Sequence, residues 1–177
     1  ELMRWIGRDP NCWKDPEFVK EYERLINELS VPVIHRAKIT DLIRRTNNKQ
    51  IVFPRKIVSE GSGNSILFDA YHDLSHLLKG ASLRMPTIFD RDVSKAMLEV
   101  GNNPNQVLGC MTGRNSQFGE REFNMVDNAS VSLLANSKDV KKSLLEAHRI
   151  LKNKGLLELT VEGKQFYDGR SIPEEER

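Results

Sequence analysis

The feature that most constrains the fold of this chain is a regular alternation of short apolar runs and helix-like stretches between about residues 65 and 160. The strongest helix-like stretch, residues 137–152, places Val140, Leu144 and Leu151 on one face and ends before Gly155. Strands that alternate with helices are typical of a parallel sheet covered by helices on both faces. We therefore predict an α/β fold. Its predicted strands lie near Leu67, Ile88, Val107, Met125 and Leu157.

The part of the chain before residue 61 has a different, helical pattern. A helix is predicted to begin at Asp15-Pro16, because Asp is a good N-cap and Pro fits the first helical position. A second, short helix is predicted over residues 37–46, and Glu60-Gly61-Ser62-Gly63-Asn64 is typical of a flexible joint. We therefore predict an N-terminal helical, basic extension over residues 1–60 and a main domain over residues 61–177.

Basic residues are concentrated in the predicted extension, although the formal net charge of the chain is only +2. Between residues 35 and 56, Asp41 is the single acidic residue. The basic side chains of this stretch form either a solvated face or a surface that contacts a polyanion, for which RNA is the first candidate. The candidate nucleic-acid-binding residues are Arg36, Lys38, Arg44, Arg45, Arg55 and Lys56.

The cysteine count and the hydropathy pattern bear on the compartment. Cys12 and Cys110 are far apart, so they form neither a disulfide framework nor a zinc-ribbon spacing. A reducing, intracellular compartment is therefore expected. No run of residues is long and apolar enough to span a bilayer, so we expect no membrane partner.

Three segments resemble motifs of the class I S-adenosylmethionine (SAM) dependent methyltransferases. Residues 92–99, Asp-Val-Ser-Lys-Ala-Met-Leu-Glu, are similar to the D-I-S-x-x-M-L-x turn after the family's second strand. Residues 123–134 resemble its fourth strand and the segment after it. Residues 144–159 resemble its L-x-E-x-x-R-V-L-K-P-G-G-x-L-x-x run. The three matches occur in the family's order and spacing.

The resemblance implies a Rossmann-like methyltransferase sheet, mainly parallel, with strand order 3-2-1-4-5 and helices on both faces. It implies that Asp92 ends the second strand and accepts hydrogen bonds from the ribose of SAM, with Asp90 as a nearby substitute. A plain helix cap is the alternative role of Asp92. Cys110 stands where many members place an Asp near the adenine, and Asn124 replaces the usual Asp beside strand four.

Two departures from the family pattern affect the expected activity. The family's first loop reads D-x-G-x-G-x-G, whereas residues 68–73, which follow the predicted first strand, are Phe-Asp-Ala-Tyr-His-Asp without a glycine. Asp69 then matches the acid that closes strand one. The chain also ends soon after strand five, so either the family's terminal hairpin is absent or the chain is a fragment of a larger protein.

A pair of histidines offers an unrelated chemistry. His72 and His76 are four residues apart, so on a helix they lie on one face, where two imidazoles can bind one metal ion. Asp73 could act as a base on bound water, but the spacing indicates no third ligand. Two surface histidines on an ordinary helix are the alternative.

Three functions follow from these patterns. The first is a degenerate methyltransferase-like domain without cofactor, which serves as a binding or scaffold element in an RNA, ribonucleoprotein or other protein complex. The second is an active SAM-dependent methyltransferase, with RNA as a candidate substrate and an atypical cofactor loop. The third is a small metal-dependent hydrolase that uses His72 and His76.

Overall fold

The computed structural model describes residues 15–28, 31–61, 65–92, 95–109, 117–128 and 137–159. These residues contain a parallel five-stranded sheet with the strand order β3-β2-β1-β4-β5. The α/β fold and the strand order predicted from the sequence are thereby confirmed. The strands are β1 (Lys56–Glu60), β2 (Thr87–Asp92), β3 (Gln106–Leu108), β4 (Phe123–Asn128) and β5 (Leu151–Leu159).

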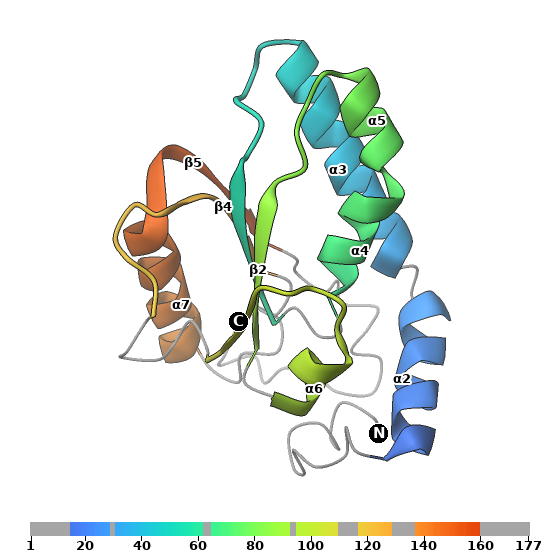
Figure 1. The fold of residues 1–177 in the computed structure, drawn as a ribbon. Helices are drawn as coiled ribbons and strands as arrows, with labels where there is room; N and C mark the ends of the chain where they lie inside the picture. The colour runs from blue at the N-terminus through green and yellow to red at the C-terminus, as the bar shows by residue number, and fades with distance from the viewer. Residues whose placement is uncertain are drawn as a thin grey trace, which may run out of the picture.

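Helices cover both faces of the sheet, as Figure 1 shows. One hydrophobic core joins the sheet to α3 and α4 and includes Ile39, Ile57 and Tyr71. The second core joins the sheet to α7 and includes Val58 and Ile150. The helices are α2 (Pro16–Glu28), α3 (Val31–Asn47), α4 (Ile66–Asp73), α5 (Ser75–Gly80), α6 (Lys95–Val100) and α7 (Ser137–Ile150). None of these helices is both long and apolar enough to cross a membrane.

The first strand lies earlier in the chain than the sequence analysis predicts. The predicted strand near Leu67 is wrong, because residues 66–73 form α4. The true first strand, β1, lies at the centre of the sheet and occupies residues 56–60, within the predicted N-terminal extension. The sheet therefore begins before residue 61, and the supposed flexible joint at Gly61 directly follows its central strand.

Because side chains alternate along each strand, the two faces of the sheet carry different sets of residues. Ile57 and Met125 belong to the core beneath α3 and α4, whereas Val58 and Val126 belong to the core beneath α7. Polar residues follow these apolar rows toward the carboxyl ends. Ser59 is in register with Asp90 on one side and Asp127 on the other, and Asp127 is in register with Glu158. Since register partners point to one face, three carboxylates share the face of Met125.

Candidate functional site

The turn after β1 begins and ends in left-handed backbone. Gly61 has a φ of 62° and Ser65 has a φ of 66°, so both adopt the left-handed conformation that glycine tolerates best. The Gly61 N–H donates a 2.9 Å hydrogen bond to the Arg91 carbonyl of β2, which ties the turn to the neighbouring strand. Residues 62–64 lie outside the described residues.

The residues that follow β1 differ from those that the sequence analysis assigned to the first loop, because residues 68–73 lie in α4. With β1 at residues 56–60, residues 59–65 correspond to the D-x-G-x-G-x-G pattern and read Ser-Glu-Gly-Ser-Gly-Asn-Ser. Gly61 and Gly63 match the first two glycines. Ser65 stands at the third and adopts a glycine-like backbone conformation there. The acid of the pattern is replaced by Ser59.

Asp92 lies beside this turn, at the end of β2. Gly61 and Asp92 follow Glu60 and Arg91, which are register partners, so both lie at the carboxyl edge of the sheet. Asp92 is buried, and its carbonyl accepts a 2.9 Å hydrogen bond from the Gly109 N–H. The structure thus brings the predicted ribose-binding acid and the glycine turn together.

Asp90 occupies a deeper position than Asp92 and is fully buried. Burial raises the pKa of Asp90 to about 6, and the neighbouring side chains of Ser65 and Asn103 oppose this shift. Neither carboxylate oxygen of Asp90 makes a hydrogen bond of ordinary geometry with the described residues. The carboxylate of Asp90 is therefore buried beneath the turn after β1 and does not reach the open carboxyl edge of the sheet.

The other two predicted cofactor residues have different outcomes. The prediction that Asp69 is the acid that closes strand one is wrong, because Asp69 lies in α4. The Asp69 side chain forms a hydrogen bond with the Asn102 side chain, and partial burial raises the pKa of Asp69. Cys110 lies outside the described residues.

The histidine pair has no metal-binding geometry in the described part of the chain. His72 packs against Phe68 with ring centroids 4.5 Å apart, and His76 Nδ1 lies 3.2 Å from the Asp73 carbonyl oxygen. Among the described residues no group of three or more His, Cys, Asp or Glu side chains could hold a metal ion. The hydrolase hypothesis gains no support from this structure.

Most of the predicted nucleic-acid-binding residues are paired with carboxylates, either on α3 itself or on other parts of the fold. Arg36 lies 2.5 Å from Asp73, and Lys56 is paired with Glu122. Asp41 forms ion pairs with both Arg44, at 2.5 Å, and Arg45, at 3.9 Å. Arg55 is exposed. These pairs reduce the positive field of the segment, and RNA binding stays a prediction.

Lys38 has a different environment from the rest of that segment. Its ammonium lies 3.2 Å from Asp127 Oδ1 and 3.6 Å from Glu158 Oε1. His35 Nδ1 lies 4.0 Å from Asp127 Oδ2. Sequence reasoning missed His35, Asp127 and Glu158. Only the position of Asp127 near the end of the fourth strand could have indicated one of them.

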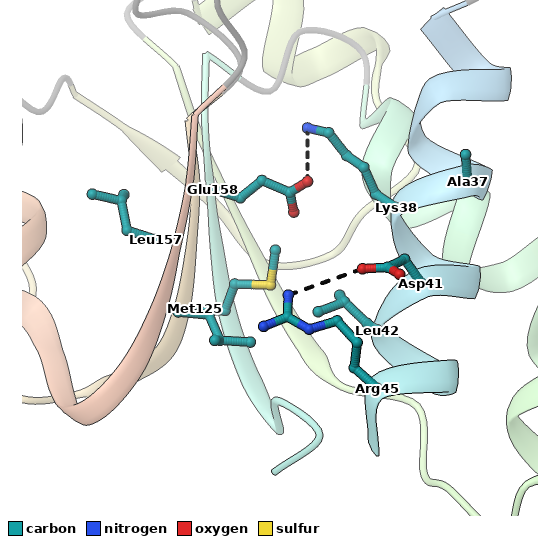
Figure 2. A pocket seen from close by; sticks show the side chains of 9 residues that line it. Ala37, Lys38, Asp41, Leu42, Arg45, Met125, Leu157 and Glu158 are labelled. Carbon is teal, nitrogen blue, oxygen red and sulfur yellow. Dashed lines mark ion pairs between the residues drawn. The ribbon is translucent and has the colours of Figure 1, made fainter. Parts of the chain in front are cut away.

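A pocket of about 350 Å³ opens next to this cluster, between α3 and the strands β4 and β5. Figure 2 shows Lys38 of α3 facing Glu158 of β5, and Asp41 paired with Arg45 farther along the helix. Leu42, Met125 and Leu156 supply apolar walls. The pocket can thus hold a small molecule that is partly apolar and partly charged.

The opposite face carries a second group of buried charges. Arg91, only 2% exposed, donates from Nε to Glu60 Oε1 at 2.7 Å and lies 4.0 Å from Glu146 of α7. Its guanidinium also lies 4.8 Å from the centroid of the Phe118 ring. Burial raises the pKa of Glu60 to about 7, against the opposing effect of Arg91. This group joins the ends of β1 and β2 to α7.

Solved structures of SAM-dependent methyltransferases share this fold. The plantazolicin methyltransferase BpumL, solved with S-adenosylhomocysteine (SAH), aligns with 94% of this chain and 63% of its own, at a TM-score of 0.59 and 15% identity. A SAM-dependent methyltransferase from Clostridium acetobutylicum aligns with 78% of this chain and 55% of its own, at a TM-score of 0.56 and 18% identity. This chain therefore spans less than two thirds of either structure.

Sequence comparisons add no closer relative. No protein-family model matches the chain, and no curated protein matches it. The sheet order and the structural matches together define a class I SAM-dependent methyltransferase fold, in agreement with the resemblance found in the sequence.

Proposed function

We propose that this domain binds SAM across the carboxyl ends of β1 and β2 and takes part in SAM-dependent methyl transfer. The observation that carries the proposal is the glycine turn after β1, with left-handed backbone at Gly61 and Ser65. Ligands of open α/β sheets bind outside the carboxyl ends of the strands, where the strand order reverses. Here the strand order reverses between β1 and β4.

The residues at this edge fit the cofactor. Residue 61 is a glycine, which has no side chain that would keep a ligand away from the backbone. Asp92 would accept hydrogen bonds from the two ribose hydroxyls, as the family resemblance implies. When bound, SAM supplies an electrophilic methyl group to a nucleophilic acceptor.

The hypothesis of a non-catalytic scaffold loses its main support. It rested on a first loop without glycine, and that loop was taken from residues that form α4. The scaffold role and an RNA partner stay predictions, and the active methyltransferase is the better supported alternative.

Calorimetric titration with SAM and SAH tests the proposal. We expect saturable binding, and Asp92→Asn should weaken it by at least about tenfold, because it removes charge-assisted hydrogen bonds. Asp69→Asn is the matched control, since it makes the same change at the acid that the structure places in α4. Absence of binding to the unmodified chain, or equal losses in both variants, would contradict the proposed site.

A further inference from the structure

The pocket beside α3 is distinct from the cofactor turn in both position and chemistry. Its volume of about 350 Å³ falls in the range of roughly 300–1,000 Å³ that is typical of small-molecule sites. Its apolar walls come from α3, β4 and β5 rather than from β1 and β2. A ligand here would therefore lie next to the cofactor edge, not in it.

Carboxylates outnumber cations at the inner end of this pocket. One ammonium, that of Lys38, serves both Asp127 and Glu158. Burial lowers the pKa of the nearby His35 despite the opposing effect of Asp127. Farther along α3, Asp41 is shared between Arg44 and Arg45. Among the described residues, the inner end therefore holds two carboxylates and one ammonium.

Some buried polar atoms of this cluster also lack hydrogen-bond partners among the described residues. Asp127 is fully buried, yet its Oδ2 has no hydrogen-bond donor among the described residues. His35 Nδ1 and the Tyr71 hydroxyl, also buried, lack partners within the same described set. Buried polar atoms without partners are rare in folded proteins and call for an explanation such as a bound group. An under-compensated buried carboxylate specifically favours a second cation nearby.

The position of the cluster connects it to the cofactor edge. Asp127 is the register partner of Ser59, which lies two residues before Gly61. Glu158 is in turn the register partner of Asp127. Adjacent strands lie about 4.8 Å apart, so the acidic end of the pocket begins one strand away from the strand that carries the glycine turn.

We propose that this pocket binds the substrate of the methyltransferase, and that the substrate is a small molecule with one protonated amino group on an apolar body. Its amino group lies against Glu158 beside Lys38, and its apolar body lies against Leu42, Met125 and Leu156. The role as substrate rests on the proposed function, whereas the binding of an amine does not.

Two probes of equal shape and opposite charge test the proposal. We would titrate 2-phenylethylamine and 3-phenylpropionate into the chain, with and without saturating SAH, and follow the heat of binding. The amine should bind saturably and the carboxylate should not. Glu158→Gln should weaken amine binding by at least about tenfold, the effect of losing a hydrogen bond to a charged group. Lys38→Met should strengthen amine binding, because the two carboxylates then attract the ligand without competition from the Lys38 ammonium.

Two further variants separate the pocket from general charge effects. Glu99→Gln makes the same change in charge on α6, where the side chain of Glu99 is 61% exposed, and should leave amine binding unchanged. Ala37→Leu enlarges a side chain that lines the pocket and should block the amine without weakening SAH binding. Thermal unfolding of each variant confirms that it is folded.

The possible results are distinguishable. Equal binding of both probes, or an unchanged affinity in both Glu158→Gln and Ala37→Leu, would overturn the amine site. If SAH binds and the amine does not, the substrate class is wrong and the proposed function stands. If the amine binds but neither SAM nor SAH does, the pocket is not the substrate site of a methyltransferase.

Discussion

The two faces of the sheet bury charge differently at the ends of the same strands. On the face beneath α7, Glu60 faces Arg91, and Glu146 and Phe118 complete the surroundings of the guanidinium. On the face beneath α3 and α4, Lys38 is shared between two carboxylates. A single step along β1, from Ser59 to Glu60, separates the two faces. The difference teaches that burial of a charge alone does not mark a ligand site, because Glu60 and Arg91 are buried and paired with each other.

The largest expected effect concerns the face beneath α7. Arg91→Met leaves Glu60 buried without its cation, so we expect a loss of about 3–5 kcal/mol in the free energy of unfolding. The double variant Glu60→Leu with Arg91→Met should recover most of this loss, because an apolar pair replaces the ion pair. Urea unfolding measures both.

Lys95→Met is the matched control, since Lys95 is 76% exposed in its pair with Glu99 on α6. Exposed pairs of this kind contribute at most about 1 kcal/mol. A double variant no more stable than Arg91→Met would show that the face beneath α7 is not a self-compensated pair.

A smaller effect, on pH dependence, sharpens the comparison because each face holds at least one carboxyl group with a raised pKa. Burial raises the pKa of Glu60 from 4.5 to about 7 and that of Asp90 from 3.8 to about 6. Groups with a raised folded pKa stabilise the fold fully below the unfolded pKa, and the contribution is lost as the pH rises through the folded pKa. We therefore expect the free energy of unfolding to fall by about 4 kcal/mol between pH 5 and pH 8.

Variants assign this loss to the two faces. Asp90→Asn should reduce the fall in the free energy of unfolding up to about pH 6. Glu60→Gln should reduce the fall that continues to about pH 7. Glu99→Gln should keep the full dependence. Stability that rises from pH 5 to pH 8 in the unmodified chain would contradict the raised pKa values of both groups.

The smallest expected effect concerns the outward side of α3, where the basic residues are paired. Asp41 compensates one of the two charges of Arg44 and Arg45. If single-stranded RNA binds here, the double variant Arg44→Gln with Arg45→Gln should reduce the slope of log affinity against log salt by only about one. Filter binding at several salt concentrations measures the slope. RNA binding that is absent at low salt would remove this partner.

The architecture could be predicted from the sequence because it depends on local patterns. The apolar runs near Ile88, Val107, Met125 and Leu157 all belong to strands, and the helix predicted from Ser137 ends at Ile150. The first strand was missed because Ser59 and Glu60 interrupt its apolar run, and the pairing of Glu60 with Arg91 lies on an adjacent strand far along the chain. The next apolar run, at residues 65–68, opens a helix instead.

The candidate sites were less predictable for a related reason. Asp92 was found because its motif is contiguous in sequence. The glycine turn was overlooked once strand one had been misplaced, although Gly61 and Gly63 are plain in the sequence. The cluster of Lys38, Asp127 and Glu158 joins a helix to two strands far along the chain, and no spacing rule connects such distant residues.

The central place of β1 also has a consequence for synthesis. Ile57 pairs with Ile88 on one side and with Met125 on the other. In a chain made from its N-terminus, β1 can meet β2 early, but its second edge stays open until residues 123–128 have left the ribosome. Long-range pairings of this kind form slowly, and an unpaired strand edge can pair with another chain in the meantime. Among the described strands with two neighbours, the strand that carries the glycine turn thus waits longest for its second partner, and its open edge needs protection in the nascent protein.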